Sequence, residues 1–294
     1  MEDILYKGLL FDGSMAFYAI NGTFMCENAK RTMNASATCT AALGRSLMGT
    51  TLLGSMHKNE NYKVTTVFKG DGPAGTIVCV ADNNGTVKGY VTNPEVELAK
   101  NAVGKLDVAK AIGKGTFRVV SDEGYRDPYI GEVEIVSGEV AQDFANYFYA
   151  STQTPSLVYL GVHISKDFFV EAASGIIIMP LPNCPKTDIE TIEKKADQIA
   201  MLTKDLKETQ DLKAVLDNIF ADCNLQYTQT INPVYQCDCS RERLEEVLIS
   251  LGENELMDII KKDKGAQVNC QFCKKSYQFN QEQLIELINL SKEN

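Results

Sequence analysis

Four cysteines near the C-terminus are the residues whose types and spacing could do chemistry. Cys237 and Cys239 form a C-x-C pair, Cys270 and Cys273 form a C-x-x-C pair, and residues 240–269 separate the two pairs. Thiolate sulfur is a preferred ligand of zinc, and two close pairs of cysteines are typical of a tetrahedral zinc site. From the spacing alone, the residues favour one structural Zn²⁺ ion over a redox role.

The elements that must position these cysteines lie in a short C-terminal domain, residues 233–294. Ser240 and Asn280 are placed to cap helices, and a further helix is expected from Glu253 to Lys262. A domain of this size buries little apolar surface and is only marginally stable by itself. A metal ion bound by the cysteines would therefore decide whether the domain folds.

A charged helical segment precedes this domain. It follows a proline-rich break at residues 180–185, and Thr187–Glu190 matches the capping-box pattern that begins a helix. Apolar residues recur at helical spacing and predict one buried face, which needs the surface of a neighbouring domain to stay folded. The pattern does not decide between a fixed pair of surface helices and helices that can leave that surface. The apolar positions are Ile189, Ile192, Ala196, Ile199, Leu202 and Leu206, then Leu212, Val215, Leu216 and Ile219.

The remaining residues, 1–180, predict an α+β domain with a mostly antiparallel sheet. Short β-rich runs separated by turn sequences are typical of a meander, and two longer stretches have helical periodicity. The expected strands are Val64–Phe68, Thr76–Val80 and Val87–Val91, and the expected helices are Ala35–Met56 and Glu139–Ser151. We therefore predict three parts: an α+β domain over 1–180, a helical linker over 181–232 and a zinc domain over 233–294.

Composition narrows the class of protein. The 29 basic and 39 acidic residues give a formal charge of −10, which repels phosphate backbones and argues against a nucleic-acid-binding surface. The N-terminal residues lack the pattern of a signal peptide, and no apolar run is long enough to span a membrane. We expect a cytoplasmic protein with no membrane partner. Cys79 lies in an apolar run and is expected to be a buried strand residue rather than a ligand.

Enzymatic motifs are weak or missing. Gly70, Gly72 and Gly75 match the dinucleotide-binding pattern, but the next residues predict a strand where that motif requires a helix. The sequence has no phosphate-binding loop and no nucleophile elbow. His57 and His163 are its only histidines, and each is expected to be a structural or surface residue. We therefore predict a protein that is not an enzyme.

Several segments, together with the two cysteine pairs, closely resemble the redox-regulated heat shock protein 33 family, the 33 kDa chaperonins. The resemblance covers essentially the whole chain, and the cysteine arrangement is its most specific part. The segments are Gly44-Arg45-Ser46-Leu47, Phe68-Lys69-Gly70-Asp71-Gly72-Pro73, Gly89-Tyr90-Val91-Thr92-Asn93-Pro94 and Val136-Ser137-Gly138-Glu139-Val140-Ala141.

The resemblance implies a bacterial, cytosolic, ATP-independent holdase chaperone of the stress response. Such a protein is inactive while its cysteines are reduced and hold one Zn²⁺ ion. Oxidation would form disulfides within Cys237/Cys239 and within Cys270/Cys273, release the metal and unfold the linker. The linker residues Ile189, Ile192, Ile199, Leu202 and Leu206 would then be available to unfolding client proteins. The resemblance also implies a homodimer in the oxidised form and hand-over of clients to ATP-dependent foldases.

Two other functions remain open from the residues. The C-x-x-C pair could belong to a thiol-disulfide oxidoreductase, which would turn over a dithiol substrate, whereas a metal-bound pair should show almost no turnover. The cysteine domain could instead be a zinc-ribbon module that binds RNA or a fixed partner protein. Salt-dependent binding would identify an RNA-binding module.

Overall fold

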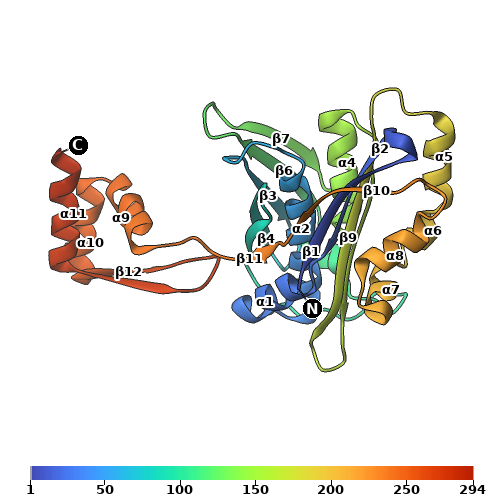
Figure 1. The fold of residues 1–294 in the computed structure, drawn as a ribbon. Coiled ribbons are helices and arrows are strands. Elements are labelled where there is room, and N and C mark those ends of the chain that lie inside the picture. Colours follow the sequence, from blue (N-terminus) through green and yellow to red (C-terminus); the bar gives the residue numbers. More distant parts are fainter. Residues whose placement is uncertain (1, 294) are drawn as a thin grey trace. The chain divides into compact units, whose positions relative to one another are not determined.

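The computed structural model describes residues 2–293, which form two compact units, Met1–Gln236 and Cys237–Asn294 (Figure 1). Both units combine helices with antiparallel strands, so the predicted α+β class is confirmed. None of the helices formed by the described residues has the length and apolar character that crossing a bilayer requires.

The first unit contains two sheets. The five-stranded sheet, called sheet A, has the order β10-β1-β2-β9-β8 and is antiparallel throughout. A 3₁₀ turn, Phe11–Gly13, joins its first two strands. The strands are β1 (Ile4–Leu10), β2 (Met15–Asn21), β8 (Leu157–Ile164), β9 (Val170–Pro180) and β10 (Gln226–Ile231).

The six-stranded sheet, called sheet B, has the order β11-β5-β4-β3-β6-β7 and contains the predicted meander. Only the short β11 pairs in parallel, with β5. A strand directly follows Gly75, which confirms that the glycine pattern there is not a dinucleotide-binding turn. The strands are β3 (Lys63–Gly70), β4 (Thr76–Asp82), β5 (Thr86–Val91), β6 (Gly115–Asp122), β7 (Tyr129–Glu134) and β11 (Val234–Tyr235).

One helix, α2 (Ala37–Ser55), packs against strands of both sheets and is buried along nearly its whole length. A Cβ atom on Gly49 would lie 2.6 Å from the ring of Phe144, so this position needs glycine for the close approach of α4. Cys79 lies in the same core, fully buried in β4 as predicted. The other helices of this core are α1 (Thr23–Met33), α3 (Val108–Ile112) and α4 (Ala141–Thr152).

The charged segment folds as four short helices: α5 (Lys186–Lys194), α6 (Ala196–Ile199), α7 (Leu202–Thr209) and α8 (Leu212–Ile219). The predicted capping box at Thr187 is wrong, because α5 begins at Lys186 after Pro185 and has no side-chain cap. The Asp188 carboxylate instead accepts a hydrogen bond from the hydroxyl of Ser14, at 2.6 Å, which ties the start of α5 to sheet A.

These four helices lie beside sheet A (Figure 1) and form with it a second apolar core. The apolar side chains of α5–α8 face the outer surface of β2 and β9, opposite the surface covered by α2. The predicted buried face is confirmed except at Ala196, which is exposed, because the helix breaks at Lys195 and the residues after the break do not continue the periodicity of α5. Ile192, Ile199, Leu202, Leu206, Leu212, Val215, Leu216 and Ile219 are buried, and Ile189 is partly buried.

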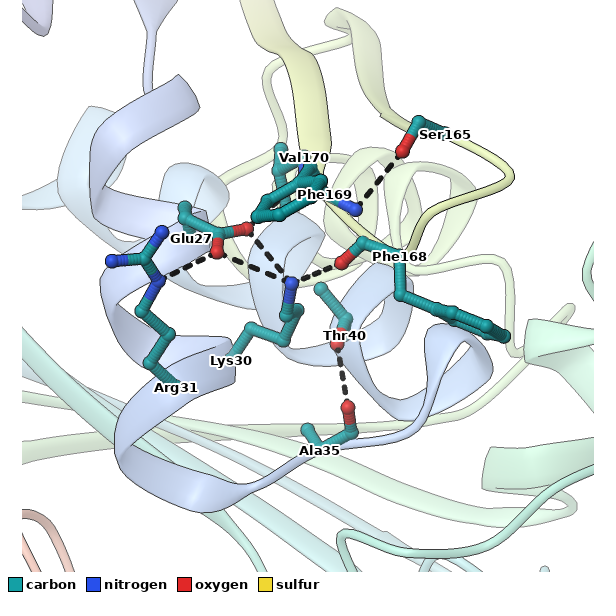
Figure 2. A network of polar contacts seen from close by, with 9 residues as sticks. All are labelled: Glu27, Lys30, Arg31, Ala35, Thr40, Ser165, Phe168, Phe169 and Val170. Atoms are coloured by element: carbon teal, nitrogen blue, oxygen red, sulfur yellow. Dashed lines mark hydrogen bonds and ion pairs between the residues drawn. The ribbon is translucent and has the colours of Figure 1, made fainter.

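The hairpin formed by β8 and β9 is anchored at its tip by α1 (Figure 2). The nearly buried carboxylate of Glu27 accepts hydrogen bonds from the Arg31 Nε, at 2.7 Å, and the Val170 backbone N–H, at 3.0 Å. Lys30 forms an ion pair with Glu27 and also donates to the carbonyl oxygen of Phe168. Two strands of sheet A are therefore held by contacts that do not involve α5–α8.

The second unit has three helices around a two-stranded sheet. The predicted caps are confirmed: Ser240 accepts from the backbone N–H of Arg243, and Asn280 and Gln283 form a reciprocal pair. Its small core includes Leu248, Leu256, Ile260, Phe279, Leu284, Leu287 and Ile288. The elements are α9 (Arg241–Ser250), α10 (Glu253–Asp263), β12 (Gly265–Asn269), β13 (Ser276–Asn280) and α11 (Gln281–Glu293).

Candidate metal centre

The four cysteines converge at one end of the second unit. The sulfur atoms of Cys237, Cys239, Cys270 and Cys273 all lie within 4.8 Å of one another. Cys237 Sγ is 3.7 Å from Cys270 Sγ, and Cys239 Sγ is 3.3 Å from Cys273 Sγ. A tetrahedral zinc ion with Zn–S bonds of about 2.3 Å would space its sulfur ligands at roughly 3.8 Å. The cluster therefore fits one metal ion with four thiolate ligands.

The C-x-x-C pair occupies the tip of the β12–β13 hairpin. The backbone N–H of Cys270 donates to the Lys275 carbonyl, and the N–H of Lys274 donates back to the Cys270 carbonyl, both at 2.9 Å. Lys274 adopts the left-handed conformation, with φ of 60°, that this tight turn requires. The turn buries Cys270, whereas Cys273 is partly exposed. This half of the cluster is held by the hairpin itself.

The C-x-C pair lies between β11 and α9, where the chain has no regular secondary structure. Ser240, which caps α9, follows the pair directly and fixes the direction in which the chain leaves it. The Tyr277 hydroxyl from β13 lies 3.3 Å from Cys239 Sγ and 3.3 Å from the Cys239 carbonyl oxygen. Tyr277 therefore connects the C-x-C pair to the hairpin.

The sulfur atoms are electrostatically unequal. Burial raises the pKa of the Cys237 thiol well above its ordinary value. Burial also raises the pKa of Cys239, but hydrogen bonds from Tyr277 and the neighbouring cysteines outweigh it and lower that pKa to about 7. Cys239 is thus the thiolate that the reduced protein forms most readily near neutral pH. These hydrogen bonds stabilise negative charge on the Cys239 sulfur, and the thiolate is the form of cysteine that binds metal or reacts with oxidants.

Other cysteines and both histidines lie apart from this cluster, in the first unit. Within residues 2–293, the four clustered cysteines are the only group of three or more His, Cys, Asp or Glu side chains placed to hold a metal ion. The His57 ring stacks on Tyr62, with centroids 3.7 Å apart, and His163 lies 3.2 Å from Glu171 in an exposed ion cluster. Both histidines are structural or surface residues, as expected.

The structure does not bring the predicted client-binding residues to the cysteines. Ile192, Ile199, Leu202 and Leu206 are buried against sheet A in the first unit, and Ile189 is partly buried there.

Sequence reasoning missed Tyr277 and Lys274 as parts of the site. Tyr277 pairs with Val268 across the β12–β13 hairpin, which the spacing of the cysteines alone does not reveal. The alternation of apolar and polar residues on each side of the C-x-x-C pair, with Ala266 and Val268 before it and Tyr277 and Phe279 after it, was the signal that could have predicted this hairpin.

Comparisons with known proteins agree over the whole chain. A family model described as "Hsp33 protein" matches residues 3–280. A 33 kDa chaperonin of Alkaliphilus oremlandii is 40% identical over 98% of this chain and 96% of its own length. One of Clostridioides difficile is 38% identical over 98% of this chain and 99% of its own length. The crystal structure of a 33 kDa chaperonin from Thermotoga maritima has a TM-score of 0.89 and 33% identity, with both chains fully covered.

Proposed function

Because the chain belongs to the Hsp33 family, we propose that it is an ATP-independent chaperone that holds unfolding proteins and is switched by cysteine oxidation. The observation that carries this proposal is the separation of two features. The reactive sulfurs lie in a small unit with little core of its own, and the apolar surface of α5–α8 lies in the other unit, buried under reduced conditions. The proposed role is not enzymatic.

In the reduced state, Cys237, Cys239, Cys270 and Cys273 would hold one Zn²⁺ ion. Bound zinc keeps its sulfur ligands as thiolates and supplies much of the folding free energy of a domain this small. Tyr277 holds Cys239 beside the hairpin, and the turn at Lys274 holds Cys270 and Cys273. These contacts keep the four sulfurs together and ready for an oxidant.

Oxidation would convert the thiolates into disulfides. Hydrogen peroxide takes two electrons from each pair of thiolates, so one sulfur–sulfur bond forms, the peroxide O–O bond breaks and, with two protons from solvent, two water molecules leave. We propose bonds between Cys237 and Cys239 and between Cys270 and Cys273, because neighbours in sequence meet fastest once the cluster opens. A disulfide sulfur is a poor metal ligand, so zinc would be released and the second unit would lose its main stabilisation.

The chain between the cysteines and α8 offers a route for this change. Cys237 directly follows β11, where the N–H groups of Val234 and Gln236 donate to carbonyl oxygens of the loop and strand at β5. Going back along the chain from β11, the preceding strand is β10, an edge strand that pairs with β1, and the helix before β10 is α8. Unfolding of the second unit would remove its restraint on this chain, and α5–α8 would leave sheet A. The apolar surfaces exposed on both sides would then bind clients.

The proposal extends to the molecule's setting. We expect unfolding proteins as clients, a homodimer in the oxidised form and transfer of clients to ATP-dependent foldases. We also expect action in the bacterial cytoplasm during oxidative stress.

Suppression of client aggregation tests the proposal. Citrate synthase, as a heat-unfolded probe, should aggregate unhindered beside reduced zinc-loaded protein and should stay soluble beside the protein oxidised with peroxide, both without ATP. Equal suppression by both forms would contradict a redox switch, and suppression by neither would contradict a holdase. Peptide mapping of the oxidised sample should find the two local disulfides, and predominant bonds from Cys237 to Cys270 or from Cys239 to Cys273 would contradict that pairing.

A further inference from the structure

Three hydroxyl groups meet inside the otherwise apolar contact between α7 and sheet A. The Tyr159 hydroxyl, from β8, donates to Thr203 Oγ1 of α7 at 2.9 Å, and Ser174 Oγ of β9 lies 2.8 Å from the same Thr203 oxygen. Ser174 is fully buried, and Thr203 is 6% exposed. We call Tyr159, Ser174 and Thr203 the hydroxyl cluster. Thr203 is its centre, because both other hydroxyls bond to it.

The sheet has a space that fits this cluster. Ser174 pairs across the strands with Gly161, and a Cβ atom on Gly161 would lie 2.2 Å from Thr203 Oγ1 and 2.5 Å from the Tyr159 hydroxyl. Ile176, the next residue of β9 on the same face, belongs to the apolar core under the helices. Ser174 and Gly161 thus interrupt the apolar surface of the sheet at the place where the Thr203 side chain contacts it.

Neighbouring contacts do not explain how α7 is positioned. The Lys207 ammonium of α7 lies 2.6 Å from the Glu171 carboxylate, but both side chains are more than one-third exposed, and such ion pairs contribute little. Leu202 and Leu206 are buried, yet apolar contact is not directional and would tolerate a shifted helix. The hydroxyl cluster is directional, because a shift of α7 would leave buried hydroxyls without partners.

The same cluster limits how tightly α7 is held. In the docked state the three hydroxyls satisfy one another, and in the released state water would satisfy each of them. Their hydrogen bonds therefore add little to docking, whereas apolar side chains at the same positions would gain free energy from burial. The β8–β9 hairpin, which carries Tyr159 and Ser174 on its strands, is bound at its tip to α1 by contacts that do not involve α7 (Figure 2).

We infer that the hydroxyl cluster fixes the register of α7 on sheet A and sets how readily α7 is released. The effect of the hydroxyl cluster on client binding rests on the proposed function. Its effect on the register and release of α7 depends on the fold alone. The hydroxyl cluster gives α7 a defined docked position but binds it less strongly than apolar side chains would. A modest loss of the other contacts that hold α5–α8 is therefore enough to free the helix.

Hydrogen exchange of residues 202–209 in the reduced protein tests the inference. Thr203→Val keeps the side-chain shape but leaves two hydroxyls facing an apolar group, so exchange should accelerate by roughly fivefold to 150-fold. The triple variant Thr203→Val, Ser174→Ala, Tyr159→Phe has no hydroxyl to satisfy and should exchange more slowly than the wild type. Thr203→Ser, which keeps the hydroxyl, and Glu208→Gln, at an exposed position of α7, should exchange within about twofold of the wild type.

Two results would overturn the inference. One is exchange in Thr203→Val no faster than in Thr203→Ser, and the other is exchange in the triple variant as fast as in Thr203→Val. Sheet B peptides should exchange equally in all variants, and the triple variant gives an answer even if Thr203→Val does not fold. Aggregation assays on the oxidised wild type separate the two claims, because failure there contradicts the proposed function while exchange still decides the role of the cluster.

Discussion

At the scale of residues, the two cysteine pairs are held in the candidate metal centre in different ways. The C-x-x-C pair is held by a closed hairpin turn, whereas the C-x-C pair is held by Tyr277 and the chain that enters α9. All four sulfurs converge, so a proposed Zn²⁺ ion would lose a ligand with any one of them.

We predict that Cys→Ser at 237, 239, 270 or 273 lowers zinc content from one equivalent to well below half, because a hydroxyl is a much poorer zinc ligand than a thiolate. Native mass spectrometry of the reduced proteins measures this. Cys184→Ser is the matched control, since Cys184 is partly exposed, lies in the first unit and does not belong to the group of four cysteines. A clustered-cysteine variant with full zinc, or a zinc-free Cys184→Ser protein, would show that the ligand set is wrong.

A second residue-scale prediction concerns Asp3, whose carboxylate caps the N-terminus of α1. It accepts from the backbone N–H groups of Phe24, at 2.8 Å, and Met25, at 2.5 Å. Burial raises its pKa from 3.8 to about 6, although these bonds lower it. A raised pKa favours the folded state below the unfolded pKa, and that advantage is lost as pH rises through 6.

Relative to Asp3→Asn, which does not titrate, the wild type should therefore lose about 2 kcal/mol of unfolding free energy between pH 4 and pH 7. Urea unfolding of both proteins at each pH measures the difference in their unfolding free energies. The pH-dependent effects of the cysteines cancel in this difference, because both proteins contain them. A difference that is constant with pH, or that changes in favour of the wild type as pH rises, would contradict the assignment.

Residue spacing identified the cysteines because metal ligation depends on a few side-chain types close in sequence. It could not identify Tyr277 or the hydroxyl cluster. Tyr277 reaches Cys239 only through the register of a hairpin, and Thr203 meets Ser174 and Tyr159 only after α7 docks on a sheet whose strands are distant in sequence.

At the scale of elements, α5–α8 are short helices whose stability comes from sheet A. Each is shorter than the length at which an isolated helix is stable in water, so packing of the apolar face keeps them folded. The sequence predicted this face because apolar residues recur at helical spacing. It also indicated the break before α8, because the apolar positions stop at Leu206 and resume at Leu212. It missed the breaks at Lys195 and Met201, because no proline or glycine marks them.

We predict that Ile199→Glu or Leu202→Glu releases these helices while zinc is still bound. A carboxylate buried at either position would lie among the apolar side chains of this core and should cost about 2 kcal/mol or more. The reduced variants should then suppress client aggregation. Gln198→Glu, on the exposed side of α6, is the control and should stay inactive when reduced.

If the reduced variants remain inactive although hydrogen exchange shows α6 and α7 open, release of the helices is insufficient for client binding. Sheet A or an oxidised dimer would then have to supply the binding surface.

At the scale of the whole molecule, the chain divides between a large unit with two cores and a small unit whose core is limited to a few side chains. The predicted boundary between the linker and the cysteine domain, at residues 232 and 233, remains a prediction. The structure adds that β10 and β11, which follow α8, are strands on the two sheets of the first unit. Single-strand pairings of this kind depend on distant partners, so local sequence patterns did not reveal them.

From this organisation we propose that oxidation of the cysteines in the small unit frees α5–α8 but leaves the two sheets of the large unit folded. The contacts of α1 with the tip of the β8–β9 hairpin and the packing of α2 between the sheets support that claim, because neither involves α5–α8. We therefore propose that the client surface is covered by helices that leave without global unfolding.

Hydrogen exchange of the reduced zinc-loaded and the peroxide-oxidised wild type, followed by mass spectrometry, tests this claim most directly. The account predicts that residues 186–219 lose protection on oxidation, while β2, β3, β4 and β9 keep theirs and aggregation suppression appears in the same sample. The release of α5–α8 on oxidation would be contradicted if the oxidised protein suppressed aggregation while residues 186–219 remained as protected as in the reduced protein.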